Sequence, residues 1–166
     1  MISDEDYSKL EEQLGRKPRG VVKVLRYNSW GHPQVVQVAP LVEGRPFPSL
    51  YWLSCPHLHK AIAKIEQSSW IKHLENIVIP GDPELKEKLR KDHLRYQKLR
   101  WESLTPDQID SVETPKYLES LKNTGVGGVR DFSRVRCLHM HYAHHLVEEN
   151  CIGQLMDQEF ETHLYL

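Results

Sequence analysis

Residues 136–145, RCLHMHYAHH, place one cysteine and four of the ten histidines of the chain in a single short segment. If residues 133–150 form a helix, Cys137, His141 and His144 have the spacing i, i+4 and i+7, and their side chains point to one side of that helix. Cysteine thiolate and histidine nitrogen are the donors that zinc prefers. The spacing therefore predicts a metal site with these three residues as ligands, zinc being favoured and iron the alternative.

A tetrahedral site needs a fourth ligand, and Cys55 is the predicted one. It stands where a short apolar strand meets a helix that begins at Pro56, and such a junction holds a side chain in a fixed place. Water is the alternative fourth ligand, and it would make the site catalytic rather than structural. The predicted metal ligands are therefore Cys55, Cys137, His141 and His144.

The segment around Cys137 also admits a second geometry. If residues 135–141 are extended, Cys137, His139 and His141 point the same way because side chains alternate along a strand. His139 would then be a ligand in place of His144. The helix is favoured because it gives the segment one apolar side. That side consists of Val135, Leu138, Tyr142 and Leu146.

Cys55 also fits a different chemistry, that of a thiol nucleophile. A thiol at a helix N-terminus faces the positive end of the helix dipole, which favours the thiolate. His139 or His141 would act as the base. Under this interpretation the catalytic residues are Cys55 and His139. The structural alternative is a small buried residue at the start of a helix, which is the commoner role of an unpaired cysteine.

A glycine-rich segment, GVGG at residues 125–128, precedes Arg130 and is a candidate anion site. Glycine lets backbone N–H groups face an anion, and a following helix N-terminus would add to the attraction. The segment lacks the lysine and the strand context of the known phosphate-binding motifs. A turn that requires positive φ is therefore the competing interpretation.

A long helix expected from Pro83 to about Leu104 carries a further set of polar side chains. His93, Tyr96 and Arg100 lie on or beside its leucine stripe. Ionisable groups that face an interior need partners or a ligand, so these residues form either a buried network or the wall of a binding site. The residues predicted to bind a small anionic ligand are Gly127, Gly128, Arg130, His93, Tyr96 and Arg100.

The elements that must position these side chains follow from hydrophobic periodicity and turn residues. β-Branched runs predict a hairpin at residues 21–27 and 34–40, and residues 50–54 predict a third strand. The segment IPGDP at residues 79–83 is expected to break the chain. Helices are expected near residues 4–14, 56–69, 83–104, 106–112, 115–122, 133–150 and 152–163. The fold class is therefore α+β, with a small N-terminal antiparallel sheet of about three strands packed against a predominantly helical C-terminal part, in a single domain over residues 1–166.

The composition is that of an ordinary globular domain. A formal net charge of -1 gives no basic field for nucleic acid or an anionic membrane. No apolar run approaches the roughly 20 residues that a bilayer crossing needs, and the acidic, polar N-terminal segment is unlike a signal peptide. Three widely spaced cysteines do not predict a disulfide framework, so a reducing, cytoplasmic location is expected.

Several longer segments together resemble one known family. They are GRPFPSLYWLSCPHL, HLRYQKLR, GVGGVRDFSRVRCLHMHYAHHL and CIGQLM. From about residue 20 to residue 156, the chain is similar to the bacterial domain-of-unknown-function family numbered 501 (DUF501). The family elements Y-W-L-[ST]-C-P, G-V-G-G, C-L-H-x-H-x-A-H and H-x-x-Y-x-x-x-R map onto residues 51–56, 125–128, 137–144 and 93–100.

This resemblance implies a choice of residues and no activity. The residues that it selects are Cys55, Cys137, His139, His141 and His144, whereas His57, His59 and His145 are particular to this chain. Three functions remain open. They are a metal-binding protein, which could extend to a metal-dependent enzyme on a small anionic substrate, a thiol-dependent enzyme, and a non-catalytic interaction module.

Overall fold

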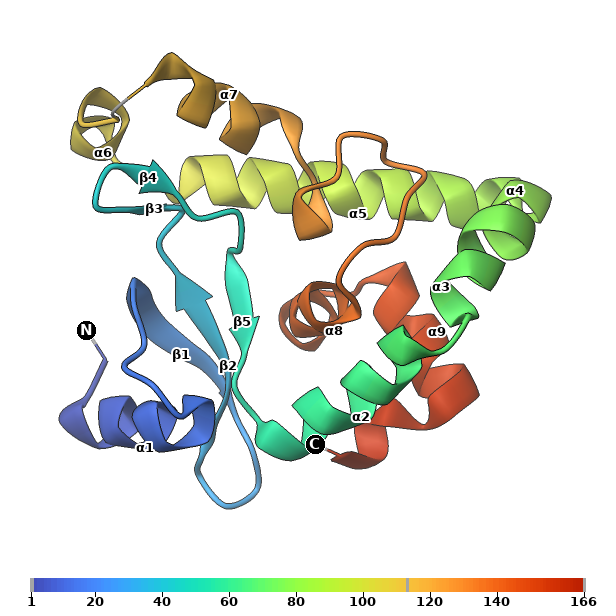
Figure 1. Ribbon diagram of the computed structural model, residues 1–166, viewed down its shortest axis with the longest axis horizontal. Coiled ribbons are helices and arrows are strands. Elements are labelled where there is room, and N and C mark those ends of the chain that lie inside the picture. Colours follow the sequence, from blue (N-terminus) through green and yellow to red (C-terminus); the bar gives the residue numbers. More distant parts are fainter. Residues whose placement is uncertain (1, 113, 166) are drawn as a thin grey trace.

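The computed structural model describes residues 2–112 and 114–165. It has the predicted α+β architecture, with strands near the N-terminus and helices over most of the remaining chain (Figure 1). The main sheet has the strand order β1-β2-β5, and both pairings are antiparallel. Its strands are β1 (Val21–Tyr27), β2 (Pro33–Val38) and β5 (Tyr51–Leu53). A two-stranded ribbon of β3 (Leu41–Val42) and β4 (Arg45–Pro46) lies between β2 and β5 in the sequence.

Strand β2 is buried on both faces because helices cover each side of the sheet. Side chains alternate along a strand, so Val35 belongs to the main core while Val36 packs with Leu10 of α1 (Asp4–Leu14) on the other face. The ends of α1 are those that the sequence predicts. Ser3 accepts the N–H of Asp6, and Gly15 ends the helix with a φ of 65°.

The helical part is built around α8, which contacts β5, α9 and α2 (Figure 1). Its longer helices are α2 (Pro56–Gln67), α5 (Pro83–Glu102), α7 (Pro115–Asn123), α8 (Leu138–Val147) and α9 (Cys151–Phe160), and the shorter ones are α6 (Pro106–Asp110) and the 3-10 turns η2 (Val126–Gly128) and η3 (Thr162–Tyr165). None of the helices within the described residues combines the length and the apolar character needed to cross a membrane.

The segment before α5 is more helical than the sequence predicts. The helix α3 (Trp70–His73), the π-helical η1 (Leu74–Val78) and α4 (Ile79–Gly81) run into one another, because their junction residues keep right-handed helical φ and ψ. Pro80 is the second residue of α4 and follows directly after the π-helical η1. The break comes later, at Asp82, which is extended and caps α5.

Helix α8 begins later than predicted. Cys137 has a φ of 60° and a ψ of 84°, which is the left-handed region, and the helix begins at Leu138 and ends at Val147. The helical spacing assumed for Cys137, His141 and His144 therefore holds only for the two histidines. The thiol instead projects from the loop that precedes the helix.

Candidate metal centre

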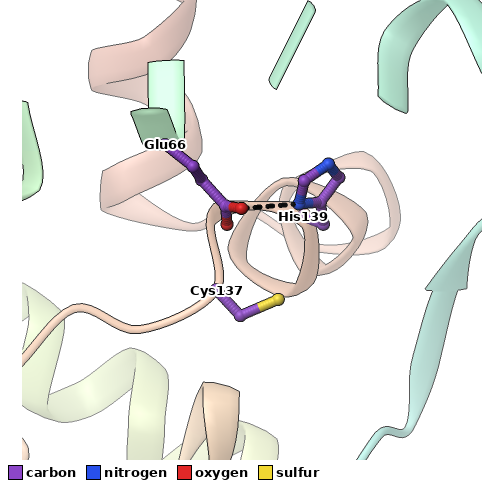
Figure 2. Close-up of side chains that lie close together, drawn as sticks. All are labelled: Glu66, Cys137 and His139. Carbon is purple, nitrogen blue, oxygen red and sulfur yellow. Dashed lines mark ion pairs between the residues drawn. The ribbon is translucent and has the colours of Figure 1, made fainter. Parts of the chain in front are cut away.

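Three potential metal ligands meet where the end of α2 faces the start of α8. Glu66 comes from the last turn of α2, while Cys137 and His139 stand on either side of the first residue of α8 (Figure 2). One ligand atom from each residue, namely a Glu66 carboxylate oxygen, Cys137 Sγ and a His139 ring nitrogen, lies within 4.8 Å of the other two. All three side chains are partly buried, so the group is a surface site with restricted access to water.

Glu66 is held in place by the start of α8. Its Oε1 accepts the N–H of Leu138 at 2.6 Å, which is one of the N–H groups that a helix leaves free at its N-terminus. Cys137 occupies the capping position, but its side chain makes no capping hydrogen bond. Glu66 thus supplies the cap and places its negative charge at the positive end of the helix dipole. The other carboxylate oxygen and the thiol are left to face His139.

The two ring nitrogens of His139 have different partners. Nδ1 lies 3.2 Å from Glu66 Oε2, and Nε2 lies 3.0 Å from the carbonyl oxygen of His59. A carbonyl oxygen only accepts, so Nε2 carries a proton. In the neutral ring, the lone pair is therefore on Nδ1, next to Glu66. Histidines that bind metals commonly donate their other N–H to a backbone carbonyl in this way.

Without an ion, the cluster favours a charged imidazole. Burial opposes the charge, but contacts with the Cys137 side chain, the Glu66 carboxylate and the His59 carbonyl outweigh it and raise the pKa of His139 to about 10. The hydrogen bond with His139 in turn lowers the pKa of Glu66. A metal cation bound here would take the place of the Nδ1 proton.

The backbone of Cys137 is strained. A φ of 60° costs a residue other than glycine about 1–2 kcal/mol. Glu43 and Glu161 also have a positive φ. Glu43 lies in the tight turn between β3 and β4, and Glu161 follows the end of α9, where this conformation commonly terminates a helix. Strained residues cluster at functional sites, where the surrounding structure holds them in place. The strain at Cys137 is thus a second observation, independent of the side-chain cluster, that singles out this thiol.

The structure does not bring Cys55 to Cys137. Cys55 directly precedes α2 and Glu66 lies near the end of that helix, so about 16 Å of helix separates them at 1.5 Å per residue. Cys55 is buried and borders a different cavity of about 730 Å³. Among the residues that line this cavity are Lys9, Trp30, His57 and Tyr165. A nucleophilic role for Cys55 stays a prediction.

The other two predicted ligands, His141 and His144, are fully buried and are oriented by Asn150. Asn150 Oδ1 accepts the N–H groups of Ile152 and Gly153 at the start of α9, so this cap fixes which way the amide points. The same oxygen lies 3.3 Å from Nδ1 of His141, while the amide nitrogen lies 3.2 Å from Nδ1 of His144.

The amide therefore selects a different tautomer for each ring. His141 donates from Nδ1 and keeps its lone pair on Nε2, whereas His144 accepts at Nδ1 and carries its proton on Nε2. Within the described part of the chain, neither Nε2 atom has a hydrogen-bond partner. Burial lowers the pKa of both rings, that of His144 to about 3. A metal ligand needs a lone pair, so Nε2 of His144 cannot serve while the bond to Asn150 is intact.

The polar residues of α5 form a buried network. Nδ1 of His93 accepts the N–H of Val126 at a distance of 3.0 Å. Nε2 of His93 donates to the carbonyl oxygen of Arg134 at a distance of 3.1 Å. The Tyr96 hydroxyl accepts the N–H of Leu50 at 2.6 Å. Both side chains are fully buried. These contacts are those of a buried network, which is one of the two arrangements predicted for these residues.

Arg100 and the glycine segment have similar structural contacts. Arg100 is fully buried and donates to the backbone carbonyls of Pro48, Leu121 and Thr124. Gly127 has a φ of 71°, and a Cβ at this position would lie 2.1 Å from the carbonyl oxygen of Arg136. Glycine is therefore required there by the turn itself. Binding of an anion by these residues, by Gly128 and by the exposed Arg130 stays a prediction.

The segments that resemble a known family all fall within one match to a family model. A family model described as a protein of unknown function (DUF501) matches residues 24–158. The chain belongs to this family. The matched part of this DUF501 protein includes Glu66, Cys137, His139 and the buried network, while the family's description gives no activity. No curated protein and no solved structure matches the chain.

Glu66 is the site residue that sequence reasoning missed. Its helix was correctly predicted to begin at Pro56, from the proline and from the spacing of apolar residues. Nothing in that spacing distinguishes Glu66 from a solvated surface glutamate. The need for a distant cap arises only from the start of α8 at Leu138, and the sequence placed that start at residue 133, so it gave no signal for Glu66.

Proposed function

We propose that this DUF501 protein binds a transition metal ion, zinc being favoured and iron the alternative, through Glu66, Cys137 and His139. The observation that carries the proposal is the convergence of a carboxylate, a thiol and an imidazole nitrogen within 4.8 Å. Zinc binds these three ligand types at about 2.0–2.3 Å, so ligand atoms around one ion lie about 3.5 Å apart. Small movements of the side chains are enough to reach that spacing.

This ligand set keeps one residue of the set predicted from the sequence. Cys137 is common to both, and Glu66 and His139 stand in place of Cys55 and the two buried histidines. The tautomers favour His139 over His144 as a ligand. His139 has its lone pair on the side of the other ligands, whereas His144 has a proton on the nitrogen that makes no hydrogen bond.

Three protein ligands leave one position on a tetrahedral ion. A water molecule bound there would be activated, and the site would then suit hydrolysis of a small anionic substrate. A fourth side chain would instead make the site structural. The site with a bound water has an exchangeable ligand, and the site with a fourth side chain has none. Both forms require metal binding, which is therefore the first property to test.

Elemental analysis of protein purified without a histidine tag tests the proposal. We expect about one equivalent of zinc or iron per chain, removed by a chelator and restored by added zinc. Glu66→Gln should abolish binding and leave the chain folded, because glutamine can still accept the Leu138 N–H. Glu87→Gln, which changes a partly buried glutamate of α5 that pairs with Arg90, is the matched control. Less than about a tenth of an equivalent, even after zinc addition, contradicts the proposal.

A thiol-dependent enzyme is the second candidate function, and the contacts of His139 with both Cys137 and Glu66 favour it. Cys137 would be the nucleophile, the imidazole of His139 would activate it, and Glu66 would orient that imidazole. Cys55, the nucleophile expected from the sequence, is only 4% exposed. Iodoacetamide should therefore label Cys137 in the metal-free protein, and His139→Gln should slow the labelling about tenfold or more. Equal labelling rates in wild type and His139→Gln argue against activation of the thiol by His139.

A non-catalytic interaction module remains the third candidate. Its polar groups would only support the fold, so Cys55→Ser and His141→Ala should lower stability without any other effect in cells. A cellular phenotype of variants that remain fully folded counts against this function.

A further inference from the structure

The proposed metal site has a second histidine beside it. His59 lies on α2 seven residues before Glu66, and two helical turns place both residues on the same side of that helix. Both also contact the same residue of α8. The ring centres of His59 and His139 are 4.0 Å apart, and the rings are inclined by 36°. The exposed imidazole thus lies directly against one of the proposed ligands.

The backbone of His59 is tied to the site, while its side chain is free to move. Its carbonyl oxygen accepts the Nε2 proton of His139 at 3.0 Å, which fixes the two residues relative to each other. The His59 side chain is exposed, and its ring makes no hydrogen bond within residues 2–112 and 114–165. An exposed side chain changes rotamer on the nanosecond timescale, so the ring can turn toward an ion without the loss of a hydrogen bond.

His59 lies outside the group whose ligand atoms are within 4.8 Å of one another, so its ring must move to reach an ion bound there. Zinc binds an imidazole nitrogen at about 2.0–2.1 Å, so two imidazoles on one tetrahedral ion have ring centres about 5 Å apart. The present separation is 4.0 Å. Shared coordination of one ion would thus open this pair of rings by about 1 Å and would rotate a His59 nitrogen toward the ion.

We propose that His59 is the fourth ligand and closes the site formed by Glu66, Cys137 and His139. This inference rests on the proposed metal binding. One thiolate, two imidazoles and one carboxylate fill a tetrahedral ion, and a filled coordination sphere is typical of structural zinc. The ion then joins α2 to α8 and has no position for a reactive water.

Titration of the metal-free full chain with cobalt(II), followed by visible absorption, tests the fourth ligand. Wild type should give the intense absorption bands of a four-coordinate tetrahedral ion, and competition with zinc then gives the zinc affinity. His59→Ala should weaken zinc binding by about tenfold to a hundredfold and alter the cobalt spectrum. His57→Ala is the matched control, because His57 is also exposed but lies about 200° around the same helix. The zinc affinity of His57→Ala should stay within about twofold of that of wild type.

The two proposals fail in different ways. If His59→Ala binds cobalt and zinc as tightly as wild type and gives the same cobalt spectrum, His59 is not the fourth ligand. The fourth position then belongs to water. A wild-type chain that binds neither ion overturns the metal site itself and the role of His59 with it. Equal losses of affinity in His57→Ala and His59→Ala also overturn the inference, because they indicate a general effect on α2.

Discussion

Asn150 caps α9 and orients two buried imidazoles, and a single substitution separates these two roles. In Asn150→Ser, the hydroxyl can still accept the N–H of Ile152 or Gly153, so the cap is kept. The shorter side chain cannot reach His141 and His144, and their Nδ1 atoms lose their partner. A buried polar group without a partner costs about 1–3 kcal/mol. Two such groups lead us to expect a loss of about 3 kcal/mol in the free energy of unfolding.

Urea unfolding followed by circular dichroism at neutral pH measures this loss. Asn150→Ala also removes the cap and should be less stable than Asn150→Ser by about 1 kcal/mol. Asp82 is a matched control, because it caps α5 from the surface and orients no imidazole. Asp82→Ser should therefore cost little. A loss below about 1 kcal/mol for Asn150→Ser, similar to that of the control, would refute the reasoning.

The tautomers offer a second and independent check. Nitrogen-15 chemical shifts of the ring nitrogens in wild type should place the proton on Nδ1 of His141 and on Nε2 of His144. The same tautomer in both rings would contradict the orientation of Asn150 inferred from the cap.

Three further predictions concern pH, backbone strain and metal. Burial lowers the pKa of His93 to about 4 and that of His144 to about 3, below the unfolded value of about 6.5. The folded chain therefore binds fewer protons, and stability that is complete above pH 6.5 should fall on acidification by about 2 kcal/mol per ring at pH 5, as measured by urea unfolding. A flat profile from pH 7.5 to pH 5 contradicts this. In metal-free protein, Cys137→Gly should unfold with a free energy about 1 kcal/mol higher than Cys137→Ala, because glycine adopts a φ of 60° without strain. Equal midpoints would show that the strain is absent. Zinc at a hundred times its dissociation constant should stabilise the wild type by about 2.7 kcal/mol and leave Glu66→Gln unchanged, which thermal unfolding with and without chelator measures.

Features with local causes were predictable from the sequence. The capped ends of α1, the hairpin of β1 and β2, and the start of α2 at Pro56 each follow from residues that stand next to one another in the chain. The buried stripe of α5 was also identified, including His93, Tyr96 and Arg100. These predictions succeed because caps, turns and periodicity act over a few residues.

The candidate site could be predicted only in part, because its geometry depends on contacts between distant segments. Cys137 and His139 were recognised by residue type. The favoured helix, which begins too early, grouped Cys137 with His141 and His144, and only the extended alternative grouped it with His139. The left-handed backbone of Cys137 could not be foreseen, since only glycine commonly signals that conformation. Glu66 becomes part of the site through the packing of α2 on α8, for which its own neighbours in the sequence give no indication.

The junction between Glu66 and the first residue of α8 has a consequence for the middle of the chain. The hydrogen-bonded residues Glu66 and Leu138 are 72 positions apart, and the segment from α3 to α7 leaves and returns at this point. In polymer terms the junction closes a loop, and a cross-link around a loop of this length removes about 4 kcal/mol of chain entropy from the unfolded state. An ion at the junction would therefore act on helices that it never touches.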